Sequence, residues 1–286
     1  MERKNTGMFI IAMIIFGSIG IFVKNIELSS SVIVLWRTYI GTLFITFVFL
    51  IRRIPFNIQG IKKNILPLLL AGIVLGGGWV FLFEAYQYLS VSMATLLYYS
   101  APIIVFFLSV FLFKEKITKH KLFGITLALI GMMIINVVGI QEVSLFGIGC
   151  GLLSAVLYAM LMILNKYIKG LSGLESTLIQ LFVAAIVMSF YVYFTTGSLI
   201  HLPLPEDIFY VVFIGVVHTG IACYCYFCSM QTLSGQSIAI LSYLDPACAL
   251  LFSFIILQER LSILQIIGGA CILGGIIYKQ MHEKDD

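Results

Sequence analysis

Charged side chains are scarce in this chain: Lys, Arg, Asp and Glu make up 10% of its 286 residues, whereas soluble globular domains carry about 25%. Hydrophobic residues account for 61%, and the mean hydropathy is +1.09. At about 20 residues per bilayer crossing, this is enough apolar sequence for roughly ten transmembrane helices and little else. The composition excludes a water-soluble fold and a sizeable catalytic domain outside the membrane.

Cysteine pairs, catalytic motifs and strong net charge are also lacking. The six cysteines all fall inside apolar runs, so we interpret them as small hydrophobic residues rather than as a disulfide framework. Cys223 and Cys225 would point about 200° apart on a helix, so their cluster with Cys228 predicts no metal site. The chain contains no HExxH, GxSxG or phosphate-binding loop, and its net charge is only +4. We therefore predict no enzyme activity, no cofactor and no nucleic-acid partner.

Apolar runs bounded by charges, Pro and Gly divide the chain into ten predicted spans. The N-terminal run is interpreted as a retained first helix because no small-x-small cleavage site follows it. The fold class is therefore an all-α membrane protein with ten transmembrane helices. The predicted spans are 7–23, 31–51, 65–86, 92–113, 122–140, 145–164, 175–195, 206–230, 236–257 and 262–279.

Loop charges predict the orientation of these spans. If the N-terminus is cytoplasmic, only Lys24 and Arg260 of the 17 Lys and Arg residues fall in outer loops, and Arg37 lies within a span. The other Lys and Arg residues lie on the inner side. We therefore expect a multi-pass protein of the cell membrane with both termini in the cytoplasm.

An internal repeat is the most informative pattern of the sequence. A shift of 144 residues aligns the two halves without a gap from Phe83 onward. The identical pairs are Phe83/Phe227, Gln87/Gln231, Leu89/Leu233, Ser90/Ser234, Leu97/Leu241, Tyr99/Tyr243, Pro102/Pro246, Ser109/Ser253, Glu115/Glu259, Gly124/Gly268 and Gly131/Gly275. A weaker match at a shift of 142 places Lys24 over Lys166.

The repeat predicts two five-helix units, 1–140 and 141–286. Because five is odd, the second unit must enter the membrane upside down relative to the first. Inverted repeats are a common plan of secondary transporters, whose substrate site lies between the halves near the middle of the membrane. One chain is then mechanically sufficient, so no oligomer is inferred.

In the repeated segments, the sequence resembles the EamA-type members of the drug/metabolite transporter superfamily. The resemblance rests on residues 83–133 and their repeat 226–275, each with a mid-helix Pro, a helix-ending Glu and a Gly-rich last helix. Arg37 and Phe16-Gly17 also fit the family pattern, although Phe16 replaces a frequent Trp. The resemblance implies a ten-helix transporter, commonly an exporter of small metabolites, in a bacterial inner membrane. It leaves the substrate open.

Ionisable residues inside the bilayer are costly and usually face a cavity or a partner. At 1.5 Å per residue, Asp245 lies about 14 Å from the cytoplasmic end of its helix, and His218 lies about 18 Å from the outer end of the preceding helix. Both are therefore expected near the middle of the membrane. We expect these two to form a proton-coupling pair. The alternatives are that Asp245 caps a half-helix beginning at Pro246, and that His218 is a satisfied core histidine. Glu175 is expected to stabilise a helix N-terminus.

Arg37 and Glu84 lie in the outer halves of their helices. They form either a structural ion pair or the ligands of a zwitterionic amino acid, with Arg37 binding its carboxylate and Glu84 its ammonium. Aromatic rings supply the rest of a cation site. The remaining predicted substrate-binding residues are Trp79, Tyr98, Tyr99, Ser242, Tyr243 and Asp245.

These observations favour a secondary active transporter that exports amino acids or amines by alternating access, with protons as the candidate coupling ion. Its predicted partners are a small-molecule substrate and membrane lipids. A second hypothesis is an importer or uncoupled facilitator of a quaternary or aromatic amine. A hypothesis of another class is a membrane receptor or scaffold, which would leave the inverted repeat without a purpose.

Overall fold

A computed structural model of the protein describes residues 2–53, 55–136, 144–199, 201–258 and 260–282. Within these residues, ten helical segments are long and apolar enough to cross a membrane. The predicted spans are confirmed, with one large shift: the third begins at Ile58 instead of 65, because Pro67 is accommodated inside the helix. Glu259 and residues 137–140 of the fifth predicted span lie outside the described residues. The segments are Lys4–Val23, Ser30–Ile51, Ile58–Tyr88, Met93–Phe113, Lys119–Asn136, Leu145–Tyr167, Gly173–Thr196, Ile208–Met230, Gly235–Ile255 and Ile263–Met281.

Several spans are made of more than one helix. The elements in chain order are α1 (Glu2–Gly17), α2 (Ile19–Val23), α3 (Ser30–Ile51), α4 (Ile58–Tyr88), α5 (Val91–Tyr98), α6 (Ala101–Phe113), α7 (Lys119–Asn136), α8 (Leu145–Tyr167), α9 (Gly173–Thr196), α10 (Ile208–Phe213), the π-helix η1 (Ile214–Ile221), α11 (Ala222–Met230), α12 (Gly235–Ser242), α13 (Leu244–Ile255) and α14 (Ile263–Met281).

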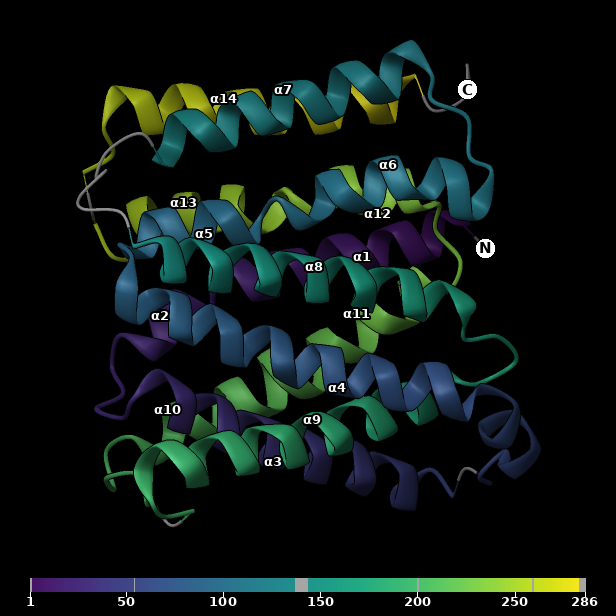
Figure 1. Cartoon of the computed structure of the whole chain (residues 1–286), viewed down its shortest axis with the longest axis vertical. Helices are drawn as coiled ribbons and strands as arrows, with labels where there is room; N and C mark the ends of the chain where they lie inside the picture. The colour runs from purple at the N-terminus through teal and green to yellow at the C-terminus, as the bar shows by residue number, and fades with distance from the viewer. Residues whose placement is uncertain (1, 54, 137–143, 200, 259, 283–286) are drawn as a thin grey trace.

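The helices form one bundle whose members run back and forth between two ends (Figure 1). The N and C marks lie at the same end, as an even number of crossings requires. Helices α7 and α14 pair along one edge, α3 and α9 lie at the opposite edge, and α4 and α8 pack together between them. Large apolar side chains are exposed along the outside of the bundle, for example Phe47, Phe111 and Phe194, where lipid would cover them.

The fourth and ninth spans are both interrupted at a tyrosine, and these two tyrosines are 144 residues apart. Helix α5 ends at its C-cap Tyr99, and α12 ends at its C-cap Tyr243. The Tyr243 hydroxyl donates a hydrogen bond to the backbone carbonyl of Tyr99, at 3.0 Å. Ser90 and Ser234, also related by the repeat, cap the two helices that precede the breaks. Equivalent residues therefore have equivalent structural roles in the two halves.

The pairing of α7 with α14 shows the same symmetry. A Cβ atom on Gly275 would lie 2.6 Å from the carbonyl oxygen of Gly124, and one on Gly268 would lie 2.6 Å from that of Gly131. The repeat aligns Gly124 with Gly268 and Gly131 with Gly275, so it exchanges the two contacts. This arrangement confirms two inverted five-helix repeats, joined where only glycine lets the backbones approach.

The predicted cap at Asp245 is wrong in position. Helix α13 begins at Leu244 with Tyr243 as its N-cap, and no side chain caps it. Asp245 and Pro246 lie within the first turn, where the missing N–H of proline costs nothing. The carboxylate of Asp245 is therefore available for another contact.

Glu175 stabilises the start of α9 as predicted. It forms a capping box with Ser172, and its carboxylate also accepts a hydrogen bond from the Asn57 backbone N–H at 2.6 Å. These contacts join the loop before α4 to the loop before α9.

Candidate functional site

A cavity of about 730 Å³ lies inside the bundle. It reaches the end where α2 stops and α3 and α5 begin, since Lys24, Ser30 and Val91 are among its lining residues. We call this end of the bundle the mouth. The lining continues past the middle of α8 and α11 to Leu161 and Phe227. A solute entering at the mouth could therefore reach more than halfway across the bundle.

Three walls of the cavity are stripes of single helices, with residues spaced at i, i+3, i+4 and i+7. Helix α4 contributes Leu75, Gly78, Trp79, Leu82, Phe83 and Tyr86, α3 contributes Ser30, Ile33, Val34 and Arg37, and α13 contributes Asp245, Ala249, Phe252 and Ser253.

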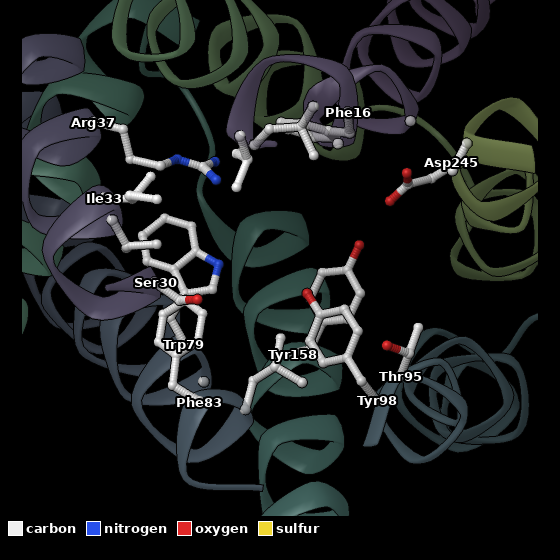
Figure 2. Close-up of a pocket in the computed structure, with 18 of the residues that line it drawn as sticks. Phe16, Ser30, Ile33, Arg37, Trp79, Phe83, Thr95, Tyr98, Tyr158 and Asp245 are labelled. Carbon is white, nitrogen blue, oxygen red and sulfur yellow. The ribbon is translucent and has the colours of Figure 1, made fainter. Parts of the chain in front are cut away.

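Arg37 enters the cavity from α3. The residue is 8% exposed, its Nε donates a hydrogen bond to the Thr219 hydroxyl at 2.9 Å, and its guanidinium carbon lies 5.2 Å from the centre of the Trp79 ring. Within the described residues, Nε is the one Arg37 nitrogen with a hydrogen bond. The two terminal nitrogens are therefore available to a ligand in the cavity (Figure 2).

Asp245 faces the cavity from the opposite side (Figure 2). Its carboxylate accepts a hydrogen bond from the Tyr99 hydroxyl at 2.7 Å. Tyr99 is itself held through its carbonyl oxygen by Tyr243. The two halves of the protein therefore contribute jointly to the position of this carboxylate.

Aromatic rings line the cavity between the two charged groups. The rings of Tyr98 and Tyr158 stack at a centroid distance of 4.7 Å and an angle of 5°, and the Tyr226 hydroxyl donates to that of Tyr158 at 2.8 Å. Trp79 lies on the Arg37 side (Figure 2). The cavity thus offers a cation, an anion and an aromatic wall between them.

The predicted pairing of His218 with Asp245 is not formed. His218 is fully buried in η1, its Nε2 is hydrogen-bonded to the Ser18 hydroxyl at 3.0 Å, and its ring contacts Phe22 and Phe213. The break between α1 and α2 at Ser18 lies between the two residues, because Gly17 packs against the backbone carbonyl of Asp245. His218 does not line the cavity.

Glu84, Ser242 and Tyr243 also lie away from the cavity lining. Glu84 accepts a hydrogen bond from the Tyr191 hydroxyl at 2.7 Å, so neither the expected ion pair with Arg37 nor a shared site with it is present. Ser242 donates to the carbonyl of Ile238 at 2.8 Å. Of the predicted substrate ligands, the structure brings together Arg37, Trp79, Tyr98, Tyr99 and Asp245 around one cavity.

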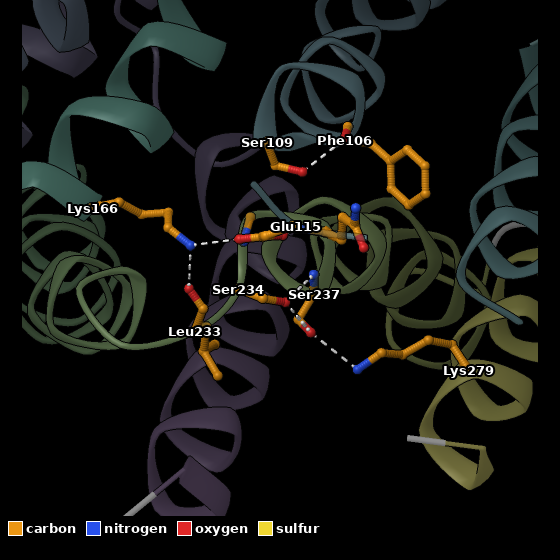
Figure 3. A network of polar contacts seen from close by, with 10 residues as sticks. Phe106, Ser109, Glu115, Lys166, Leu233, Ser234, Ser237 and Lys279 are labelled. Carbon is orange, nitrogen blue, oxygen red and sulfur yellow. Dashed lines mark hydrogen bonds and ion pairs between the residues drawn. The ribbon is translucent and has the colours of Figure 1, made fainter. Parts of the chain in front are cut away.

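The other end of the bundle is held together by a polar cluster around Glu115 (Figure 3). The Glu115 carboxylate accepts hydrogen bonds from the backbone N–H groups of Gly235 at 2.7 Å and Gln236 at 3.0 Å, and from Lys166 Nζ at 2.9 Å. Lys166 also donates to the Leu233 carbonyl at 3.0 Å. We call these contacts the latch. They join the end of α6, the end of α8 and the start of α12.

Helix geometry explains why a carboxylate occupies this position. The first N–H groups of a helix have no partner within it and carry a partial positive charge. Burial alone would raise the pKa of Glu115, but the hydrogen bonds from Lys166, Gln236 and Gly235 outweigh it and the pKa is lowered. Glu115 is therefore ionised at neutral pH.

Comparison with known proteins agrees with this architecture. The model of the EamA-like transporter family matches residues 6–137 and again residues 145–278. The chain belongs to this family. The family resemblance in the sequence is thereby confirmed, and the general role is that of a membrane transporter.

The relatives of this EamA-like transporter carry the same general designation. The uncharacterized transporter YxxF of Bacillus subtilis is 30% identical over 96% of this chain and 89% of its own length. An uncharacterized transporter of Archaeoglobus fulgidus is 26% identical over 96% of both chains. One crystal structure superposes with a TM-score of 0.85 at 18% identity, covering 97% of this chain and 98% of the other, which shows that the fold is shared.

Sequence reasoning missed Thr219 as a candidate site residue. Thr219 gives no signal, because its contact with Arg37 depends on the local π-helical geometry of η1.

Proposed function

We propose that this EamA-like transporter is a secondary active exporter of small zwitterionic metabolites, with amino acids as the substrate class. The observation that supports this most directly is the pair of opposite charges across one cavity: the free terminal nitrogens of Arg37 and the carboxylate of Asp245. The planar guanidinium suits a carboxylate, and a carboxylate flanked by aromatic rings suits an ammonium. Asp245 thereby takes the role that the sequence suggested for Glu84.

The cavity has a volume appropriate to such a substrate. About 730 Å³ falls within the usual range for small-molecule pockets, roughly 300 to 1,000 Å³. The stacked rings of Tyr98 and Tyr158 favour an aromatic side chain between the two charged groups. Alternating access would then carry the solute between the halves of the inverted repeat.

Counterflow in proteoliposomes tests the proposal with tyrosine and tyramine, which differ by one carboxylate. Uptake of tyrosine with little uptake of tyramine is expected, and Arg37→Met should abolish it while Glu84→Gln retains most of it. Uptake of tyramine alone would support the second candidate, an amine importer or facilitator, which rests on Asp245 and the aromatic wall. No flux of either solute would contradict an aromatic amino acid or aromatic amine as the substrate. No flux of any solute would favour a receptor or scaffold.

Proton coupling, in this proposal, depends on Asp245. It lies in the cavity, whereas His218 is held by Ser18 on the far side of the α1–α2 break. Uptake measured with and without a pH gradient should differ in the wild type and be equal in Asp245→Asn. Equal rates in the wild type would contradict proton coupling, and a gradient effect lost in His218→Gln but kept in Asp245→Asn would reassign it.

The proposed orientation places both termini and the latch in the cytoplasm and the mouth outside, in the cell membrane. The loop charges support it through the positive-inside rule. Reporter fusions after Lys24 and after Lys169 should report opposite sides of the membrane, and a periplasmic signal after Lys169 would contradict it.

A further inference from the structure

The π-helix η1 interrupts the eighth span at the level of Arg37. Segments of π-helix are rare and frequently lie at functional sites. In η1 the Thr219 hydroxyl donates a hydrogen bond to the carbonyl of Ile214, five residues earlier, at 3.2 Å. The same hydroxyl oxygen accepts the hydrogen bond from Arg37 Nε. Thr219 therefore connects the π-helical backbone directly to the cationic group of the cavity.

Close packing fixes Thr219 against α3. A Cβ atom on Gly41 would lie 2.8 Å from Cγ2 of Thr219, and one on Gly215 would lie 2.5 Å from Cγ2 of Ile40. Thr219 is fully buried. The distance between α3 and η1 is thus set by side chains that pack directly on glycine, and Thr219 cannot shift without moving a helix.

The bond to Thr219 limits how Arg37 can bind an anion. A guanidinium binds a carboxylate either side-on, through Nε and one terminal nitrogen, or end-on, through both terminal nitrogens. Thr219 occupies Nε and Trp79 covers one face of the group. Only the end-on pair remains available to a ligand in the cavity.

We infer that Thr219 is a positioning residue that holds Arg37 for end-on recognition of a substrate carboxylate, and so contributes to the preference for carboxylate-bearing solutes. The inference about the carboxylate rests on the proposed function. The positioning of Arg37 by Thr219 does not, so the two parts can be tested separately.

Two substitutions separate the hydroxyl of Thr219 from its packing. Thr219→Val keeps the branched shape and removes the hydroxyl, whereas Thr219→Ser keeps the hydroxyl and removes a methyl group. In counterflow, Thr219→Val should raise the KM for tyrosine about tenfold, the scale of one hydrogen bond to a charged group, with the maximal rate unchanged. Thr219→Ser should stay within about twofold of the wild type, because the lost methyl makes no polar contact.

Equal defects in the two variants would overturn the inference, because a packing role alone would then suffice. An unchanged KM in Thr219→Val would also overturn it.

Fluorescence of Trp79 tests the positioning without any substrate. In a Trp36→Phe parent, Trp79 is the one remaining tryptophan of the chain, and its ring lies under the guanidinium. Thr219→Val should shift its emission in the direction produced by Arg37→Met, and Thr219→Ser should not. If wild-type protein fails to take up tyrosine, the proposed function falls, while the emission still decides whether Thr219 holds Arg37. Unchanged emission in Thr219→Val would reject that role.

Discussion

The mouth and the latch end of the bundle each begin a helix with equivalent residues, but the described surroundings of these residues differ. Helix α5 begins at Val91 after the cap Ser90, and α12 begins at Gly235 after the cap Ser234. Val91 lines the cavity, whereas the N–H of Gly235 is covered by the carboxylate of Glu115. Among the described residues, one sequence pattern therefore borders the cavity at one end and binds a carboxylate at the other.

The difference indicates what closes an end of this protein. At the latch, a carboxylate and an ammonium satisfy helix N–H and carbonyl groups, and the Lys166 ammonium lies 4.3 Å from the Phe113 ring centre. Water can take over these polar groups when the end opens, so the net cost of opening is well below the gross strength of the bonds that are broken. A closure of this kind is firm but reversible, as alternating access requires.

Removing the latch carboxylate should have the largest effect on this comparison. Glu115→Ala removes the acceptor of two backbone N–H groups and one of the two acceptors of Lys166. Because hydrogen bonds to charged groups are worth about 1.5–3 kcal/mol each, the mouth-open state should lose at least about tenfold in population. The rate of thiol labelling at Val91→Cys should fall accordingly.

A matched control for Glu115→Ala is Lys116→Ala, which alters an exposed neighbour and should leave the labelling rate unchanged. Glu115→Gln keeps an acceptor without the charge and should lie between the two. Unaltered labelling in Glu115→Ala would mean that the latch does not hold the bundle in this state.

The α7–α14 pair is where the two halves remain equivalent, so damage there should destabilise the fold without favouring either end. A Cβ atom at Gly275 would press on the backbone of Gly124, whereas one at the adjacent Gly274 meets only Leu127 at 3.8 Å. Gly275→Ala should cost about 1–3 kcal/mol of stability, the scale of overpacking. Thermal unfolding in detergent should show a lower midpoint for Gly275→Ala than for Gly274→Ala, and equal midpoints would contradict the close approach.

The sequence predicts the fold almost completely because the fold depends on patterns of apolar residues and on an internal repeat. Span length, the 144-residue repeat and the paired glycines are all visible in the sequence. The alignment also predicts that Tyr99 and Tyr243 are equivalent, although it does not predict that the helices break there. The inversion follows from the odd number of helices in each half and needs no contact information.

The site is less predictable because each residue along a helix turns by about 100°. Glu84 follows Phe83 directly, yet Phe83 lines the cavity and Glu84 faces Tyr191. His218 and Asp245 lie at matching depths but on opposite sides of the α1–α2 break. Depth is readable from the sequence, whereas helix rotation and the intervening backbone are not.

A smaller effect is expected at Lys166. Lys166→Met removes the ion pair and the bond to Leu233 but leaves Glu115 on the helix N-terminus. Because a single partly exposed pair contributes about 1 kcal/mol or less, thiol labelling at Val91→Cys should slow by only about threefold. Lys169→Met, which changes an exposed lysine in the loop that follows α8, is the control. A loss equal to that of Glu115→Ala would mean that the ion pair, and not the helix N-terminus, carries the closure.

The smallest effect is the pH dependence of the latch. The pKa of Glu115 is lowered from its usual value of 4.5, because burial is outweighed by the hydrogen bonds from Lys166, Gln236 and Gly235. A carboxylate whose pKa is lower in the folded state stabilises it fully above the usual value, and the contribution is lost as the pH falls through the lowered pKa. The latch should therefore be unchanged between pH 8 and 5 and should weaken only in stronger acid.

Hydrogen exchange at the N–H groups of Gly235 and Gln236 tests this pH dependence. After correction for intrinsic rates, the protection should be constant between pH 8 and 5 and should decline at lower pH. Glu115→Gln should remove this decline, and a loss of protection already at pH 6 in the wild type would show that another group controls the latch.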